Sequence, residues 1–153
     1  MNPRTPFVIG WTEYVDLPDW KVTGLRAKVD TGSRTSALHV EDIRLLARDR
    51  VAFDVVLHRS KRDRRIRVRT RIRRRGIVRS STGERSQRIF VTTRLRLGPL
   101  EKEIEISLVD REQMIHRMLL GREALSGPLL VDVNHRSLLG VRHRRKRARP
   151  APG

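Results

Sequence analysis

Strict alternation between apolar and charged side chains is the feature that most limits how this chain can fold. Across residues 66–73, every second residue is apolar or β-branched and each residue between is arginine. A repeat of two is typical of a β-strand, so we expect a strand here with a buried face and an arginine face. Residues 94–97 and 103–108 alternate in the same way on either side of Gly98-Pro99. They predict a hairpin in which arginines face glutamates.

Short apolar runs separated by turn residues predict further strands at 7–9, 20–29, 53–57, 129–131 and 137–139. Helical periodicity is scarce, since only 110–118 and 121–126 are candidates and 42–47 is ambiguous. This pattern indicates an all-β barrel or sandwich with one short helix. The length suits a single domain, which we place at residues 1–141, followed by a disordered basic tail at 142–153.

The charge is strongly unbalanced, with 35 Lys and Arg against 17 Asp and Glu and a net charge of +18. Such a chain attracts polyanions, and the candidates are nucleic acid, an acidic polypeptide and an anionic membrane surface. The arginine strands carry no aromatic residue on which a base could stack, which argues against nucleic acid. We find no run long enough for a membrane helix and no signal peptide. We therefore expect a cytoplasmic protein without a membrane partner.

Motifs for cofactors and for several enzyme classes are absent from the sequence. It contains no cysteine, neither common Gly-rich phosphate loop, no His-Glu-x-x-His pair and no Gly-x-Ser-x-Gly elbow. The five histidines do not have the spacing of metal ligands. The expectation is a protein without cofactor or metal.

One segment, Lys28–His39, has the features of a catalytic loop. An apolar strand ends at Asp30, and Thr31 and Gly32 follow at once. Glycine lets backbone N–H groups approach the carboxylate, and such donors favour its ionised form. An ordinary Asx turn is the alternative for an isolated Asp-Thr-Gly tripeptide.

A second segment, Met118–Leu125, places two leucines, a glycine and an arginine ahead of a short helix. Together the two segments resemble the retropepsin family of aspartic peptidases. Supporting matches lie at 10–11, 80–85 and 92–98. They make residues 8–141 similar to a bacterial branch labelled "ATP-dependent zinc proteases", whose genes lie beside ribosomal-protein glutamate ligases. The chain itself lacks ATP and zinc motifs.

The resemblance implies a closed β-barrel that supplies half of an active site. Aspartic peptidases activate water between two carboxylates. Of the nine aspartates in the chain, only Asp30 is followed by Thr-Gly or Ser-Gly, so the resemblance requires a twofold homodimer. It implies that Thr31 braces the two loops and that Gly32 leaves each loop open to substrate. The support behind the loop is expected from Leu119, Leu120 and Gly121.

Basic residues around the motif indicate an acidic substrate, and the bacterial branch implies poly-α-glutamate chains. The candidates for substrate contact are Lys28, Ser33, Arg34, Ser36, His39 and Arg122. Alternatives remain open: Arg34 could form a structural ion pair that braces the dimer, and His39 could be a core or interface histidine. Lys28 could favour the ionised carboxylate or face solvent. A flap over the site falls at 58–65 or at 74–85.

Two other functions compete with an acidic-chain endopeptidase. One is a non-catalytic basic β-barrel that binds RNA or the ribosome, a contact that the basic tail could also make. The other is a catalytically silent dimer that binds an adaptor.

Overall fold

The computed structural model describes residues 5–58, 60–61, 63–79 and 82–140 of the chain. The predicted tail lies outside these residues, as do Ser80 and Ser81 in one candidate flap and Arg59 and Arg62 in the other. Within them the chain forms β1 (Phe7–Gly10), β2 (Thr12–Leu17), the 3-10 helix η1 (Pro18–Trp20), β3 (Val22–Val29), β4 (Ser36–Leu46), β5 (Arg50–Val56), β6 (Arg65–Arg71), β7 (Arg74–Arg79), β8 (Arg85–Leu97), β9 (Leu100–Val109), β10 (Met118–Leu120), α1 (Arg122–Leu125) and β11 (Leu129–Asp132). The prediction of an all-β fold with one short helix is confirmed.

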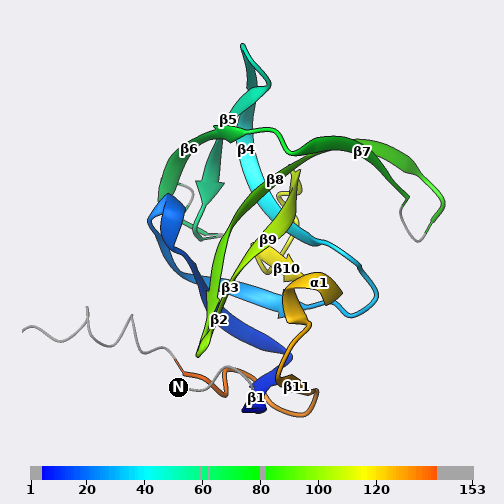
Figure 1. The fold of residues 1–153 in the computed structure, drawn as a ribbon. Coiled ribbons are helices and arrows are strands. Elements are labelled where there is room, and N and C mark those ends of the chain that lie inside the picture. The colour runs from blue at the N-terminus through cyan, green and yellow to red at the C-terminus, as the bar shows by residue number, and fades with distance from the viewer. Residues whose placement is uncertain (1–4, 59, 62, 80–81, 141–153) are drawn as a thin grey trace, which may run out of the picture.

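The main sheet closes into a ring (Figure 1). Its strands follow the order β10–β3–β2–β8–β9–β4, and β4 pairs again with β10. Closure pairs the strand edges that an open sheet would leave exposed. Beyond the ring, β5 and β6 extend the sheet from β4, and β7 pairs with β8. A separate parallel pair, β1 and β11, lies at the lower end of the molecule in Figure 1.

The alternating segments form the predicted strands. Residues 66–71 belong to β6, whose arginines at 67, 69 and 71 are exposed. β8 and β9 form the predicted hairpin, with Arg94 opposite Glu103 and Arg96 opposite Glu101. The Arg96 Nε lies 3.5 Å from Glu101 Oε2, so the expected arginine–glutamate pairing across these strands is confirmed.

Aliphatic side chains fill the ring. Fully buried members of this core are Leu17, Leu25, Leu38, Leu95 and Ile106. Burying such a side chain contributes about 1.5–3 kcal/mol, so the alternating pattern stabilises the closed sheet. None of the helices in the described residues has the length and apolar character needed to cross a membrane.

The helix predicted at 110–118 is wrong. The segment makes turns and then enters β10 at Met118. The buried Arg117 guanidinium donates to the carbonyl oxygens of Glu112 and Met114. These bonds satisfy carbonyls that a helix would pair with backbone N–H groups, so the segment is stable as a bend.

The strand predicted at 137–139 is also wrong, because a buried carboxylate takes its N–H groups. Glu13 accepts hydrogen bonds from the backbone N of Leu138 at 2.8 Å and of Leu139 at 3.2 Å. It also accepts one from Gly10 N at 2.7 Å, and so joins this segment to the end of β1. The ambiguous segment 42–47 continues β4 as far as Leu46.

Candidate active site

The Asp-Thr-Gly loop begins where β3 ends, and its carboxylate is held by its own loop. Gly32 N donates to Asp30 Oδ1 at 3.2 Å, and the Ser33 hydroxyl donates to Oδ2 at 2.8 Å. The first bond forms an Asx turn, so the turn by itself does not separate a catalytic loop from the alternative. Asp30 is half-buried, whereas Thr31 and Gly32 are exposed. The carboxylate therefore has a fixed orientation at an accessible tip.

A strand threaded behind the loop distinguishes it from an ordinary turn. β10 pairs in parallel with β3 and antiparallel with β4, the two strands that flank the loop. Asp30 N donates to the carbonyl oxygen of Leu120 at 2.9 Å. Leu120 is fully buried and Leu119 is half-buried. Both leucines thus belong to the strand that backs the loop, where the resemblance placed its support.

Gly121 continues this support and leaves no room for a side chain. A Cβ on Gly121 would lie 2.5 Å from the carbonyl carbon of Thr35 and 2.9 Å from the carbonyl oxygen of Arg34. Ordinary contact begins at 3.4 Å, so only glycine fits without displacing the loop backbone. Gly121 N also donates to Ser36 Oγ at 3.1 Å.

The start of α1 fixes the far side of the loop. Arg122 N donates to Ser33 O at 2.8 Å, and the Arg122 guanidinium donates to Thr31 O at 2.9 Å. Glu123 N donates to Arg34 O at 3.0 Å. Three carbonyl oxygens of the loop are therefore tied to two residues of α1, which keeps the backbone around Asp30 rigid.

The three basic residues proposed for substrate contact differ in the groups that they contact in the structure. Arg34 Nε lies 2.8 Å from Glu123 Oε1. This ion pair lies within one chain, so it differs from the dimer-bracing pair that the sequence left open. This pair is exposed, with side-chain accessibilities of 79% and 44%, and contributes about 0–1 kcal/mol. Arg122 is exposed, and one of its guanidinium nitrogens donates a hydrogen bond to the carbonyl oxygen of Thr31. Lys28 is exposed on β3.

Two residues proposed for substrate contact are instead inside the protein, which corrects that expectation. Ser36 is 1% exposed, and its hydroxyl accepts the Gly121 N–H. His39 is fully buried, and its Nε2 lies 2.9 Å from Glu41 Oε2. Neither side chain presents surface to a substrate. Both join the strand after the loop to neighbouring segments.

His39, Glu41 and Asp110 bring potential ligand atoms within 4.8 Å of one another. The hydrogen bonds argue against a metal there. Arg111 N donates to His39 Nδ1 at 3.0 Å, so Nδ1 carries no proton and Nε2 carries the one that it shares with Glu41. A metal on Nε2 would displace that proton and leave both ring nitrogens deprotonated. The cluster fits a hydrogen-bond network.

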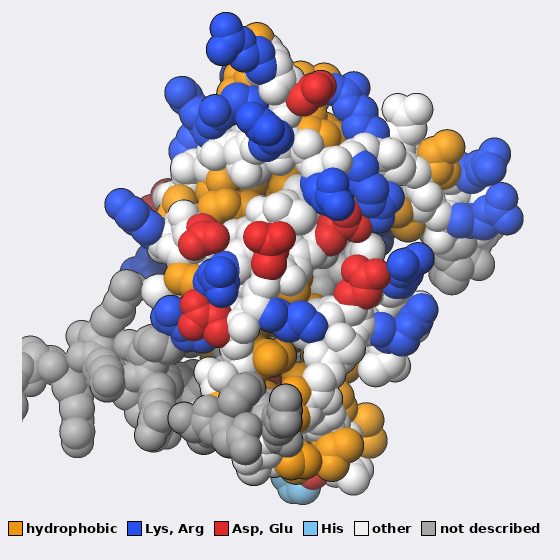
Figure 2. Space-filling view, viewed as in Figure 1, with side chains coloured by type: hydrophobic (Ala, Val, Ile, Leu, Met, Phe, Trp, Pro, Cys, Tyr) orange, Lys and Arg blue, Asp and Glu red, His pale blue; other side chains and the backbone are white. Residues whose placement is uncertain are grey.

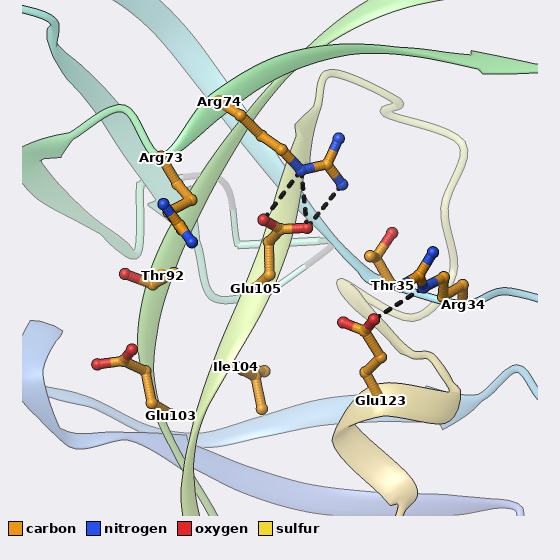
Figure 3. A pocket seen from close by; sticks show the side chains of 9 residues that line it. All are labelled: Arg34, Thr35, Arg73, Arg74, Thr92, Glu103, Ile104, Glu105 and Glu123. Atoms are coloured by element: carbon orange, nitrogen blue, oxygen red, sulfur yellow. Dashed lines mark hydrogen bonds and ion pairs between the residues drawn. The ribbon is translucent and has the colours of Figure 1, made fainter.

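A cavity of about 540 Å³ lies beside the loop (Figure 3). Its walls are Arg34, Thr35, Arg73, Arg74, Thr92, Glu103, Ile104, Glu105 and Glu123. The Arg74 guanidinium binds Glu105 with Nη2 2.6 Å from Oε1, and the carboxylate holds the pKa of Arg74 above its usual value. Three arginines face three glutamates, so an acidic ligand must compete with internal carboxylates. Sequence reasoning missed this group because Glu103 and Glu105 lie on β9, whereas Glu123 lies on the separate element α1.

The surface shows the same mixture of charges. On the face drawn in Figure 2, acidic side chains lie among arginines across the middle, whereas Lys and Arg predominate at the top. The top holds the β4–β5 turn in Figure 1. Close to it, Arg50 of β5 lies directly opposite Arg71 of β6. On this face, the mainly basic region at the top is therefore separate from the mixed charges across the middle.

A closed β-ring, one short helix and an Asp-Thr-Gly loop backed by a threaded strand define a retropepsin-like protein. A family model described as "RimB-like: Retropepsin-like aspartic endopeptidase RimB" matches residues 8–146. The chain belongs to this RimB-like family.

Similar curated proteins are named for a ligase. A probable alpha-L-glutamate ligase of Shewanella pealeana (strain ATCC 700345 / ANG-SQ1) is 37% identical over 139 residues, covering 88% of this chain and 30% of the relative. One of Desulfotalea psychrophila (strain LSv54 / DSM 12343) is 34% identical over 138 residues, covering 87% and 29%. The chain spans about 30% of the length of these relatives.

The crystal structure of Lpg0085, a protein of unknown function from Legionella pneumophila subsp. pneumophila str. Philadelphia 1, has a similar fold. It matches with a TM-score of 0.69 at 24% identity, covering 86% of this chain and 96% of that one. At this identity, the likeness supports the fold alone.

Proposed function

We propose that two copies of this chain form an aspartic endopeptidase that hydrolyses peptide bonds in acidic, glutamate-rich polypeptides. The observation that carries the proposal is the Asp30 loop, whose carboxylate is oriented by Gly32 N and Ser33 Oγ. The loop is exposed at its tip and is fixed from behind by β10 and α1. One chain supplies one such carboxylate, and the chemistry needs two.

In this mechanism, the paired Asp30 carboxylates share one proton. The ionised carboxylate removes a proton from water, and the resulting hydroxide adds to the scissile carbonyl carbon. The protonated carboxyl donates to the carbonyl oxygen. When the tetrahedral intermediate collapses, the C–N bond breaks and the amine nitrogen takes the proton that the first carboxyl received from water. A hydroxyl of the intermediate returns a proton to the second carboxylate. Each step requires both acids on one side of the substrate, which makes the homodimer the active unit.

The β1–β11 sheet is the surface that we assign to the second copy. Val8 lies opposite Leu130, and these side chains are 46% and 63% exposed, with Val133 beyond them at 73%. This apolar group gathers at the lower end of Figure 2. Trp11, directly after β1, accepts a hydrogen bond from Val29 N at 2.9 Å. A partner seated on this sheet would therefore lie beside the strand that carries Asp30.

We assign the flap to the hairpin of β7 and β8, within the 74–85 candidate. It projects from the ring in Figure 1. Arg73 and Arg74 at its base line the same cavity as Arg34 and Thr35 from the catalytic segment. A hairpin rooted there can close over a bound chain and exclude water. The 58–65 alternative connects β5 and β6, farther along the sheet extension.

The preference for glutamate-rich chains rests on charge and on the relatives. The net charge of +18 favours an acidic polymer. The relatives named alpha-L-glutamate ligase contain a region similar to this chain, which would place hydrolysis of glutamyl chains beside their synthesis.

The test is incubation with poly-α-glutamate followed by mass spectrometry, with Asp30→Asn as the matched control. Wild type should release shorter oligomers, and Asp30→Asn should lower the rate at least about 10³-fold because an amide cannot serve as the base. Equal activity of the two proteins would refute the proposal. No cleavage by wild type, together with RNA binding of steep salt dependence, would favour the non-catalytic barrel.

The dimer surface has its own test in sedimentation velocity. Leu130→Asp should yield monomers and abolish hydrolysis, since it places a charge in the apolar contact. The control is Leu45→Asp, at a leucine that is 59% exposed on β4 and should leave both properties unchanged. A dimeric, active Leu130→Asp protein would contradict the assigned surface.

A further inference from the structure

Arg88 on β8 lies beyond the last glutamate of the series on the neighbouring strand β9. β9 carries glutamates at 101, 103 and 105 and then Ser107. Ser107 lies opposite Phe90 of β8, and Arg88 is the next residue of β8 that points to the same face of the sheet. Thr92 and Glu105, which line the cavity, belong to that face as well. Arg88 therefore extends the cavity face to a position that lacks a glutamate.

Arg88 is half-buried without a counter-charge. Its Nη1 donates to Ser107 Oγ at 3.4 Å, a long hydrogen bond. Among the described residues, no carboxylate lies within ion-pair distance of it, whereas Arg74 and Arg96 each contact a glutamate. Burial lowers the pKa of Arg88, and the charge of Arg111 lowers it further.

A guanidinium that is partly withdrawn from water is costly unless it is paired. Here a second cation raises the cost. A carboxylate brought from outside would relieve both the desolvation and the repulsion, and a planar arginine fork binds such a group bidentately. The arrangement is that of a binding site for an anion.

This site is connected to the candidate catalytic loop. Ser107 Oγ donates to the carbonyl oxygen of Ser36 at 3.3 Å. Ser36 Oγ in turn accepts from Gly121 N at 3.1 Å, and Gly121 packs behind the loop. Two serines thus connect Arg88 with the glycine that packs behind the Asp30 loop.

We infer that Arg88 provides a subsite for one side-chain carboxylate of an acidic peptide. The inference rests on the proposed function and names a residue that selects glutamate. A peptide fits better than a nucleic acid, because the aromatic ring on this face, Phe90, is buried under the Arg74 guanidinium at 3.7 Å and cannot stack on a base.

A binding assay tests the subsite apart from catalysis. Fluorescently labelled hexa-α-glutamate is titrated into the Asp30→Asn protein, alone and with Arg88→Gln or Arg69→Gln. Arg69 is an exposed arginine of β6 and serves as the charge-matched control. Arg88→Gln should weaken binding about tenfold or more and Arg69→Gln less than about twofold. Equal effects of these two changes, or displacement by an RNA oligonucleotide at lower concentration than by unlabelled peptide, would overturn the subsite.

A second assay uses a series of hexa-α-glutamates, each with a single Gln in place of Glu at a different position. In wild type, kcat/KM should fall about tenfold when Gln occupies one particular position, compared with the all-glutamate peptide. In Arg88→Gln, Gln at that position should no longer lower kcat/KM, and the effects at the other positions should be unchanged. An unchanged positional preference in Arg88→Gln overturns the subsite while leaving the peptidase intact. If wild type cleaves none of the peptides but binding still depends on Arg88, the proposed peptidase function is refuted and the subsite is supported. Arg88→Met, which should melt no lower than wild type, excludes a merely structural role.

Discussion

Replacement of Gly121 by alanine tests how the loop is supported. The added Cβ would lie 2.5 Å from the Thr35 carbonyl carbon, against 3.4 Å for ordinary contact. Relief requires a backbone displacement of roughly 1 Å, and the displaced atoms belong to the segment that carries Asp30. Overpacking of this kind costs about 1–3 kcal/mol of unfolding free energy. Displacing a catalytic group by about 1 Å can cost about a hundredfold in rate.

Urea unfolding and peptide hydrolysis together measure this change. We expect Gly121→Ala to lower the urea midpoint of unfolding, in line with a loss of about 1–3 kcal/mol. We also expect it to reduce kcat/KM by about a hundredfold. The control is Gly127→Ala, because nothing lies within 4 Å of a Cβ there and only its backbone conformation, with φ +134°, opposes the change. If Gly121→Ala matches wild type in both assays, the loop is not held as we describe.

The remaining predictions concern charges. Glu13→Gln should lower the unfolding free energy by about 1–3 kcal/mol in urea titrations, because the buried carboxylate accepts three backbone N–H bonds. The exposed change Glu101→Gln should cost less than about 0.5 kcal/mol, and equal losses would refute the assignment. Burial, followed by the charges of three nearby cations, lowers the pKa of His116 below its usual 6.5. Folding therefore favours the neutral ring, so this stabilising contribution is present above pH 6.5 and is lost as pH falls through the folded pKa. Stability measured from pH 7 to 5 should fall less steeply in His116→Gln than in wild type, and identical slopes would contradict the sign. A double-mutant cycle on Arg74 and Glu105 should give a coupling of about 1 kcal/mol or less that weakens in 1 M salt, and a salt-independent value would indicate a drier pair than the structure has.

Local patterns in the sequence were sufficient for much of the fold. The repeat of two predicted β6 and the β8–β9 hairpin because each strand has one face toward the core. The Asp-Thr-Gly and Leu-Leu-Gly segments identified the loop and its backing strand because both are short and contiguous.

Contacts between distant residues account for what the sequence did not reveal. The bend at 110–118 depends on the buried Arg117, and the segment 137–139 depends on Glu13, which is 125 residues away from Leu138. The burial of His39 follows from the way in which β4 packs beside β9 and the segment after it. The glutamates of the cavity likewise meet their arginines only once the ring has closed.

The distance between the two Asp30 carboxylates in a crystal of the assembled protein is the measurement that bears most directly on the central claim. We expect a twofold dimer in which the carboxylate oxygens of the two loops lie about 3 Å apart, close enough to share a proton. A monomer, or a dimer in which the two loops face away from each other, would contradict the account.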